Sequence, residues 1–252
     1  MEEWWHYILL IVVGFVVGFI NTIAGGASVI SLPILIFLGL PPNVANGTNR
    51  IAILVQTAMA TAGFKSKGVS TFPFNIYLGI SALFGAIIGA KIAVDIDGDL
   101  FNKILAIIMV GIIFVISFMP KIKAEELIER TTGKHLWLGI LIFFVLGIYG
   151  GFINIGIGFM IILILHFLNH MSLVRVNATK VTVVFIYTIS ALVVFALNDD
   201  VNWKVGLILA IGNGSGAWVS SRVSVGKGDG YVKKVLIIMV IVMAVKLWFF
   251  KV

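Results

Sequence analysis

The stretch GFINTIAGGAS, residues 18–28, decides the fold because its opening returns in the second half of the chain as GFINIGIG, residues 151–158. Each copy places an asparagine and several glycines inside sequence that is otherwise apolar. Three further matches follow in the same order, and the one nearest the first pairs NGTNR, residues 46–50, with NATKV, residues 177–181. Four matches in one order indicate an internal duplication.

Composition predicts that the duplicated units lie in a membrane. Hydrophobic residues make up 60% of the 252 residues, charged residues only 12%, and the mean hydropathy is +1.14. This leaves too little polar surface to coat a water-soluble globule. The chain is therefore predicted to be an all-α, polytopic integral membrane protein. Its net charge of +7 is typical of basic residues held at a cytoplasmic face, so no nucleic-acid partner is expected.

Turns rich in glycine, proline, asparagine or charge divide each half into about five helical elements. In the first half the elements are predicted at residues 4–20, 28–39, 44–64, 71–94 and 101–119. In the second half they are predicted at residues 136–153, 159–168, 174–197, 203–223 and 231–250. The domains follow from this division: a first transmembrane repeat at 1–119, a polar linker at 120–135 and a second transmembrane repeat at 136–252.

The second element of each half is too short to cross a bilayer. About a dozen residues make roughly 16 to 18 Å of helix, whereas the hydrocarbon core is about 30 Å thick. If each short element returns as a hairpin with its predecessor, each half crosses an odd number of times and the second half is inverted. We therefore predict two inverted-topology repeats whose short broken or re-entrant helices meet near the midplane. With the N-terminus outside the cell membrane, most of the eighteen lysines and arginines face the cytoplasm.

Broken helices at membrane depth predict where the site lies, because they expose backbone donors and acceptors to a cavity. The polar clusters at 46–50 and 177–180 are predicted to cap the third element of each half, whose positive dipole end would favour an anion. These residues could instead have structural roles: the glycines could allow tight helix packing, and the cations could extend from a helix end to the membrane surface. The candidate substrate-binding residues are Asn21, Gly25, Gly26, Asn46, Thr48, Asn49, Arg50, Gln56, Thr57, Asn154, Gly156, Gly158, Asn177, Thr179 and Lys180.

The charged residues predict the sign of the cargo. Every aspartate and glutamate falls in a terminus, a turn or the linker, whereas Arg50 and Lys180 lie beside asparagine and threonine within predicted spans. A cation carrier would need buried carboxylates, so a small anion is favoured. The sequence contains neither a P-loop nor an HExxH motif, which disfavours an ATP-driven pump and a metalloprotease. We predict no catalytic residue, no metal site and no cofactor.

Residues 14–49, GFVVGFINTIAGGASVISLPILIFLGLPPNVANGTN, resemble the sulfite exporter TauE/SafE family, and residues 147–181 resemble that family's repeat. The chain has Gly25-Gly26-Ala27 where family members often show three glycines. The resemblance implies transport, often outward, of sulfur-containing anions such as sulfite, sulfoacetate and other organosulfonates, or thiosulfate.

Residues and resemblance together predict a secondary transporter that works by alternating access and is not an enzyme, and export is the expected direction. Its expected partners are the lipid bilayer and a small anionic substrate, and a homo-oligomer is left open. A passive anion channel is the alternative, followed by a membrane-embedded enzyme or an accessory subunit.

Overall fold

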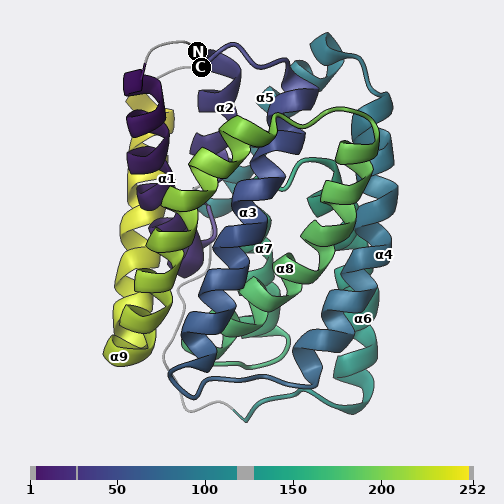
Figure 1. The fold of residues 1–252 in the computed structure, drawn as a ribbon. Helices are drawn as coiled ribbons and strands as arrows, with labels where there is room; N and C mark the ends of the chain where they lie inside the picture. Colours follow the sequence, from purple (N-terminus) through teal and green to yellow (C-terminus); the bar gives the residue numbers. More distant parts are fainter. Residues whose placement is uncertain (1–3, 27, 118–127, 250–252) are drawn as a thin grey trace.

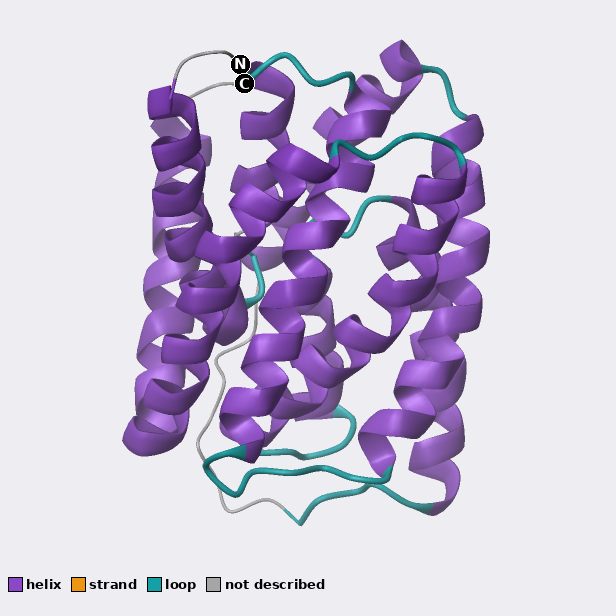
Figure 2. Cartoon of the chain, in the orientation of Figure 1, coloured by secondary structure: helices purple, strands orange, loops and turns teal. Residues whose placement is uncertain are grey.

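The computed structural model describes residues 4–26, 28–117 and 128–249, and within these ranges all regular structure is helical (Figures 1 and 2). This confirms the predicted all-α class. The helices in chain order are α1 (Trp4–Ala24), α2 (Ser28–Phe37), α3 (Pro42–Lys65), α4 (Phe74–Asp95), α5 (Gly98–Ser117), α6 (Gly133–Phe152), α7 (Ile157–Phe167), α8 (Leu173–Leu197) and α9 (Trp203–Phe249).

Helix lengths match a chain that crosses a bilayer several times. Among the described residues, α1, α4, α6 and α8 are long and apolar enough to span a membrane. Their 20 to 25 residues make about 30 to 37 Å of helix, against a hydrocarbon core of about 30 Å. The 10 residues of α2 and the 11 of α7 make only about 15 to 17 Å, so the predicted short elements are confirmed.

Most boundaries lie within three residues of the predictions, and the end of α1 and the start of α6 are the two differences that affect the hinge and the linker. Helix α1 was predicted to end at residue 20, but it runs on to Ala24. It ends where Gly25, with a positive φ of 78°, donates its backbone N–H to the Asn21 carbonyl at 2.9 Å. Helix α6 begins at Gly133, inside the predicted linker, and residues 118–127 lie outside the described ranges.

Helix α9 joins the two last predicted elements into one 47-residue element bent at Gly228. The φ of 69° and ψ of −174° at Gly228 are not helical, and this backbone conformation is open to glycine and strained for other residues. The bend separates a first arm, residues 203–227, from a second arm, residues 229–249 (Figure 1). The two predicted elements therefore correspond to the two arms.

The two halves pack reciprocally, because the first helix of each half lies against the fourth element of the other. Helix α1 packs on the first arm of α9 and helix α6 packs on α4. A Cβ at Gly18 would lie 2.1 Å from the Asn213 carbonyl oxygen, and one at the repeat-equivalent Gly151 would lie 2.2 Å from that of Ala86. Glycine is required at both places because backbones touch there.

The short helices return in opposite directions. In Figure 1, α1 and α2 fold back toward the upper end of the molecule, where the chain starts, whereas α6 and α7 fold back toward the lower end. Helices α3, α4 and α8 run between the two ends. Inverted repeats would give this arrangement. That the two halves are related by inversion stays a prediction.

Candidate functional site

The hinge that joins α1 to α2 touches the first turn of α7, directly after the hinge that joins α6 to α7. A Cβ added at Gly25 would lie 2.5 Å from the carbonyl carbon of Gly158. A Cβ at Gly26 would overlap the ring of Phe159. Both hinges therefore need bare backbone at their meeting point, which explains the glycines of the two repeated motifs.

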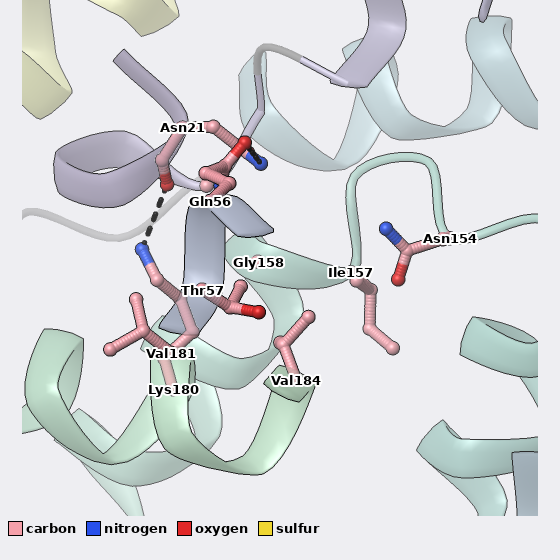
Figure 3. Close-up of a pocket in the computed structure, with 10 residues that line it drawn as sticks. Asn21, Gln56, Thr57, Asn154, Ile157, Gly158, Lys180, Val181 and Val184 are labelled. Atoms are coloured by element: carbon pink, nitrogen blue, oxygen red, sulfur yellow. Dashed lines mark hydrogen bonds between the residues drawn. The ribbon is translucent and has the colours of Figure 1, made fainter. Parts of the chain in front are cut away.

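A small cavity lies where the hinges meet (Figure 3). It holds only about 20 Å³ of free volume, which is room for about one water molecule. Helices α1, α3, α7 and α8 and both hinges contribute its wall. The lining residues are Asn21, Gly25, Gln56, Thr57, Asn154, Ile157, Gly158, Lys180, Val181 and Val184.

Lys180 is the only charged residue among those ten, all of which belong to the described ranges. Its Nζ donates to the carbonyl oxygens of Asn21 at 3.1 Å and Thr22 at 2.9 Å, and to Oδ1 of Asn177 at 2.8 Å. Asn177 in turn donates its side-chain amide to the Ile23 carbonyl at 3.0 Å. Three acceptors match the three N–H donors of an ammonium group.

Arg50 makes the corresponding contacts in the other half. Its guanidinium donates to the carbonyl oxygens of Gly150 at 2.5 Å and Gly151 at 2.8 Å, and to Oδ1 of Asn46 at 3.2 Å. Asn46 donates to the Phe152 carbonyl at 2.8 Å. The guanidinium also lies 5.4 Å from the ring centroid of Phe195.

Each cation therefore binds the last turn of the first helix of the opposite half: Lys180 binds α1 and Arg50 binds α6. The last carbonyls of a helix have no intrahelical donor and carry the negative end of its dipole, so a buried cation beside them is stabilised. Both cations are nearly inaccessible, with exposed fractions of 0% for Arg50 and 3% for Lys180. Their contacts differ from the lipid-facing snorkelling that the sequence left open.

The prediction that the polar clusters cap the third element of each half is wrong. Helix α3 begins at Pro42 after Pro41, and helix α8 begins at Leu173 with Ser172 as its N-cap. The proline pair supplies a ready helix start, because proline is favoured at the first helical position. Asn46 and Asn177 consequently lie in the second helical turn, and the amide ends of α3 and α8 point away from the cations.

The hinge asparagines are held by residues at matching repeat positions. Asn21 donates to Oε1 of Gln56 at 3.5 Å, and Asn213 donates to the same oxygen at 3.2 Å. Asn154 accepts a short hydrogen bond from the Tyr187 hydroxyl. Residues 56 and 187 are equivalent when residues 46 and 177 are aligned, so the repeat itself was the signal that could have identified Tyr187.

Seven of the fifteen predicted residues line the cavity: Asn21, Gly25, Gln56, Thr57, Asn154, Gly158 and Lys180. The other eight are not among its lining residues. Asn46, Asn177 and Arg50 bind the helix ends, and Gly26 packs on Phe159.

The remaining four of those eight residues have local structural contacts or positions and are Thr48, Asn49, Gly156 and Thr179. Thr48 accepts from the Asn202 amide at 2.8 Å, which fixes the start of α9. Thr179 bonds to Thr71 at 3.0 Å. Gly156 precedes α7 with a φ of 68°, and Asn49 is buried. Sequence reasoning missed the apolar wall of Ile157, Val181 and Val184, because nothing in their local sequence sets them apart from lipid-facing residues.

Comparison with known proteins supports a transport role. Residues 10–247 match the family described as sulfite exporter TauE/SafE. A Sinorhizobium protein named "Probable membrane transporter protein ORF9" is 29% identical over 94% of this chain and 90% of its own length. A "Probable membrane transporter protein" of Haemophilus influenzae is 28% identical over 95% and 93%, and YfcA of Escherichia coli K12, which bears the same description, is 27% identical over 95% and 88%. No solved structure matches the chain.

Proposed function

Because this chain belongs to the sulfite exporter TauE/SafE family of membrane transporters, we propose that it is a secondary transporter that exports small sulfur-containing anions by alternating access. Sulfite, organosulfonates such as sulfoacetate, and thiosulfate are the candidate cargoes. The observation that carries the proposal is the cavity at the meeting point of the hinges, where a buried ammonium group and side-chain amides face each other and the lining residues include no carboxylate.

The cavity offers the contacts that an oxyanion needs. The ammonium group of Lys180 supplies the opposite charge, and charge-assisted hydrogen bonds to oxyanions are stronger than neutral ones. The side-chain amides of Asn21, Gln56 and Asn154 supply further polar groups, and the two hinge glycines let the backbone approach the cargo. Arg50, which does not line the cavity, stabilises the end of α6 in this proposal.

Transport requires the cavity to widen, because about 20 Å³ of free volume is less than any sulfur oxyanion occupies. The hinges would separate as one group of helices rocks against the other, which is how repeat-built transporters alternate access. The reciprocal packing supports this motion: α1 moves with the first arm of α9, and α6 moves with α4. The contact between Gly25 and Gly158 would open and close in each cycle.

The membrane potential favours the outward direction. An inside-negative potential drives each negative charge outward with about 2.3 kcal/mol per 100 mV, so an exporter can run on potential and concentration alone. We place the protein in the inner or plasma membrane with its N-terminus outside. In this orientation the lower end of Figure 1, where α3 ends at Lys65 and α8 begins at Leu173, faces the cytoplasm.

Flux through reconstituted vesicles tests the proposal. The full chain should give saturable efflux of sulfite that an imposed potential accelerates. Lys180→Ala should reduce this efflux at least about tenfold, since a charge-assisted contact is lost. The exposed Lys67→Ala is the matched control and should leave efflux unchanged. Absence of saturable efflux would contradict the proposal, and discrete single-channel conductance steps would assign the protein as a channel.

A further inference from the structure

Of the cations Arg50 and Lys180, Lys180 faces the cavity and Arg50 does not. Lys180 lines it, whereas Arg50 is fully buried behind it, with both terminal guanidinium nitrogens donating to the end of α6. The repeat equivalent of Arg50 is Val181, which lines the cavity as an apolar side chain. Ile157 and Val184 extend this apolar wall. The cavity thus combines one positive charge with an apolar side.

From this asymmetry we propose that the site selects its cargo by charge, carrying monoanions and rejecting dianions. The inference rests on the proposed transport function and narrows its cargo. Hydrogensulfite and short alkylsulfonates carry one charge, and an alkyl group would meet the apolar wall. Sulfate, thiosulfate, sulfoacetate and fully deprotonated sulfite carry two. The second charge of a dianion would be buried without a partner, which is far more costly than an unmade neutral hydrogen bond.

The hydrogen bonds of Lys180 indicate how one anion is accommodated. All three ammonium hydrogens are engaged, so an anion has to replace one acceptor. The carbonyl oxygen of Asn21 is the one to be replaced, because its bond is the longest at 3.1 Å and Asn21 itself lines the cavity (Figure 3). The bonds to Thr22 and Asn177 remain and keep the ammonium group in place. Lys180 then offers one N–H donor and one positive charge to the cargo.

Charge selection is tested by measuring efflux through the wild-type protein of anions whose charge does not change with pH. Methanesulfonate carries one charge on its single sulfonate group, and ethane-1,2-disulfonate carries two, one on each of its two sulfonate groups. In reconstituted vesicles at equal concentration, efflux of methanesulfonate should exceed that of ethane-1,2-disulfonate by about 100-fold or more. Sulfate, a dianion smaller than the disulfonate, should be excluded to a similar degree, which removes size as the explanation.

Equal efflux of methanesulfonate and sulfate would overturn charge selection while leaving the transport function standing. Absence of saturable efflux for every anion would overturn the transport function, and charge selection with it. Because this comparison uses the unaltered chain, it does not depend on whether any variant folds.

Two variants then assign the selection to the charge of the cavity. Lys180→Met keeps the length of the side chain but removes the charge, so methanesulfonate efflux should fall at least about tenfold while efflux of the dianions stays low. Thr57→Lys adds a second cation to the lining and should raise sulfate efflux relative to methanesulfonate by at least about tenfold. A folded Thr57→Lys protein whose preference is unchanged would contradict the inference.

Discussion

The hinge between α1 and α2 and the hinge between α6 and α7 occupy equivalent places in the two halves, but the cations that hold them have different access to the cavity. Lys180 holds the end of α1 and lines the cavity. Arg50 holds the end of α6 and is sealed behind it. Both cations donate to carbonyl oxygens in the last turn of a helix. In the proposed mechanism, the buried cation is structural in one half and available to the cargo in the other.

The variants Arg50→Ala and Lys180→Ala test the different roles of the two cations most directly. Arg50→Ala leaves two helix-end carbonyls and Asn46 without a donor in a sealed site, and should lower the free energy of unfolding by about 3 to 5 kcal/mol. Lys180→Ala should cost about 2 to 3 kcal/mol, because water can enter the neighbouring cavity and solvate the freed groups. Unfolding in detergent measures both.

The exposed Arg130→Ala is the control for these two variants and should change stability by less than about 0.5 kcal/mol. If Arg50→Ala and Lys180→Ala destabilise the protein equally, the assignment of Arg50 to a purely structural role loses its basis.

The glycine contact between the hinges gives the next largest effect. Gly25→Ala places a methyl group 2.5 Å from the backbone of Gly158 at a φ of 78°. Gly39 has a φ of 92° with nothing within 4 Å, so Gly39→Ala isolates the cost of the backbone conformation at about 1 to 2 kcal/mol. Gly25→Ala should lower the free energy of unfolding by about 1 to 3 kcal/mol more than Gly39→Ala does, since the added methyl group pushes the hinges apart.

Thermal unfolding of the two glycine variants measures this difference, and efflux assays show whether the hinge contact also matters for transport. We expect Gly39→Ala to transport normally and Gly25→Ala to transport poorly. Equal stability of the two variants would mean that the hinge contact contributes nothing beyond local geometry.

The smallest predicted effect concerns the partners of the hinge asparagines. Tyr187→Phe removes the hydroxyl that donates to Asn154 and should destabilise the protein by about 1 kcal/mol. The site keeps its charge, so efflux should fall by less than about tenfold. Gln56→Leu, at the equivalent position, should cost slightly more because Asn21 and Asn213 both donate to that side chain. A larger loss of efflux in Tyr187→Phe would place Asn154 among the main cargo ligands.

Local composition was enough to predict most of the fold. Long apolar runs gave α1, α4, α6 and α8, and run length alone marked α2 and α7 as too short to span. The glycine hinges were also predictable, because glycine and asparagine interrupt apolar sequence there. The end of α1 was placed four residues too early, since Asn21 reads as a breaker although its backbone is helical.

The site was harder to predict because it depends on contacts between the halves. Arg50 and its carbonyl acceptors are about a hundred residues apart, and no local pattern states that the guanidinium faces α6 and not the cavity. The apolar wall was missed for the same reason, since a valine such as Val181 is typical of any buried position in a helix. The repeat alignment carried more of this information than the residue types did, as the match of Gln56 with Tyr187 shows.

The binding of each cation to the opposite half also sets an order for biogenesis. When Lys180 is synthesised, its acceptors in α1 were made 158 and 159 residues earlier. For Arg50 the order of synthesis is reversed, because its acceptors lie 100 and 101 residues later in the chain. A lone arginine in hydrocarbon is costly, so the nascent first half must keep α3 near the interface, or shielded by the insertion machinery, until α6 arrives.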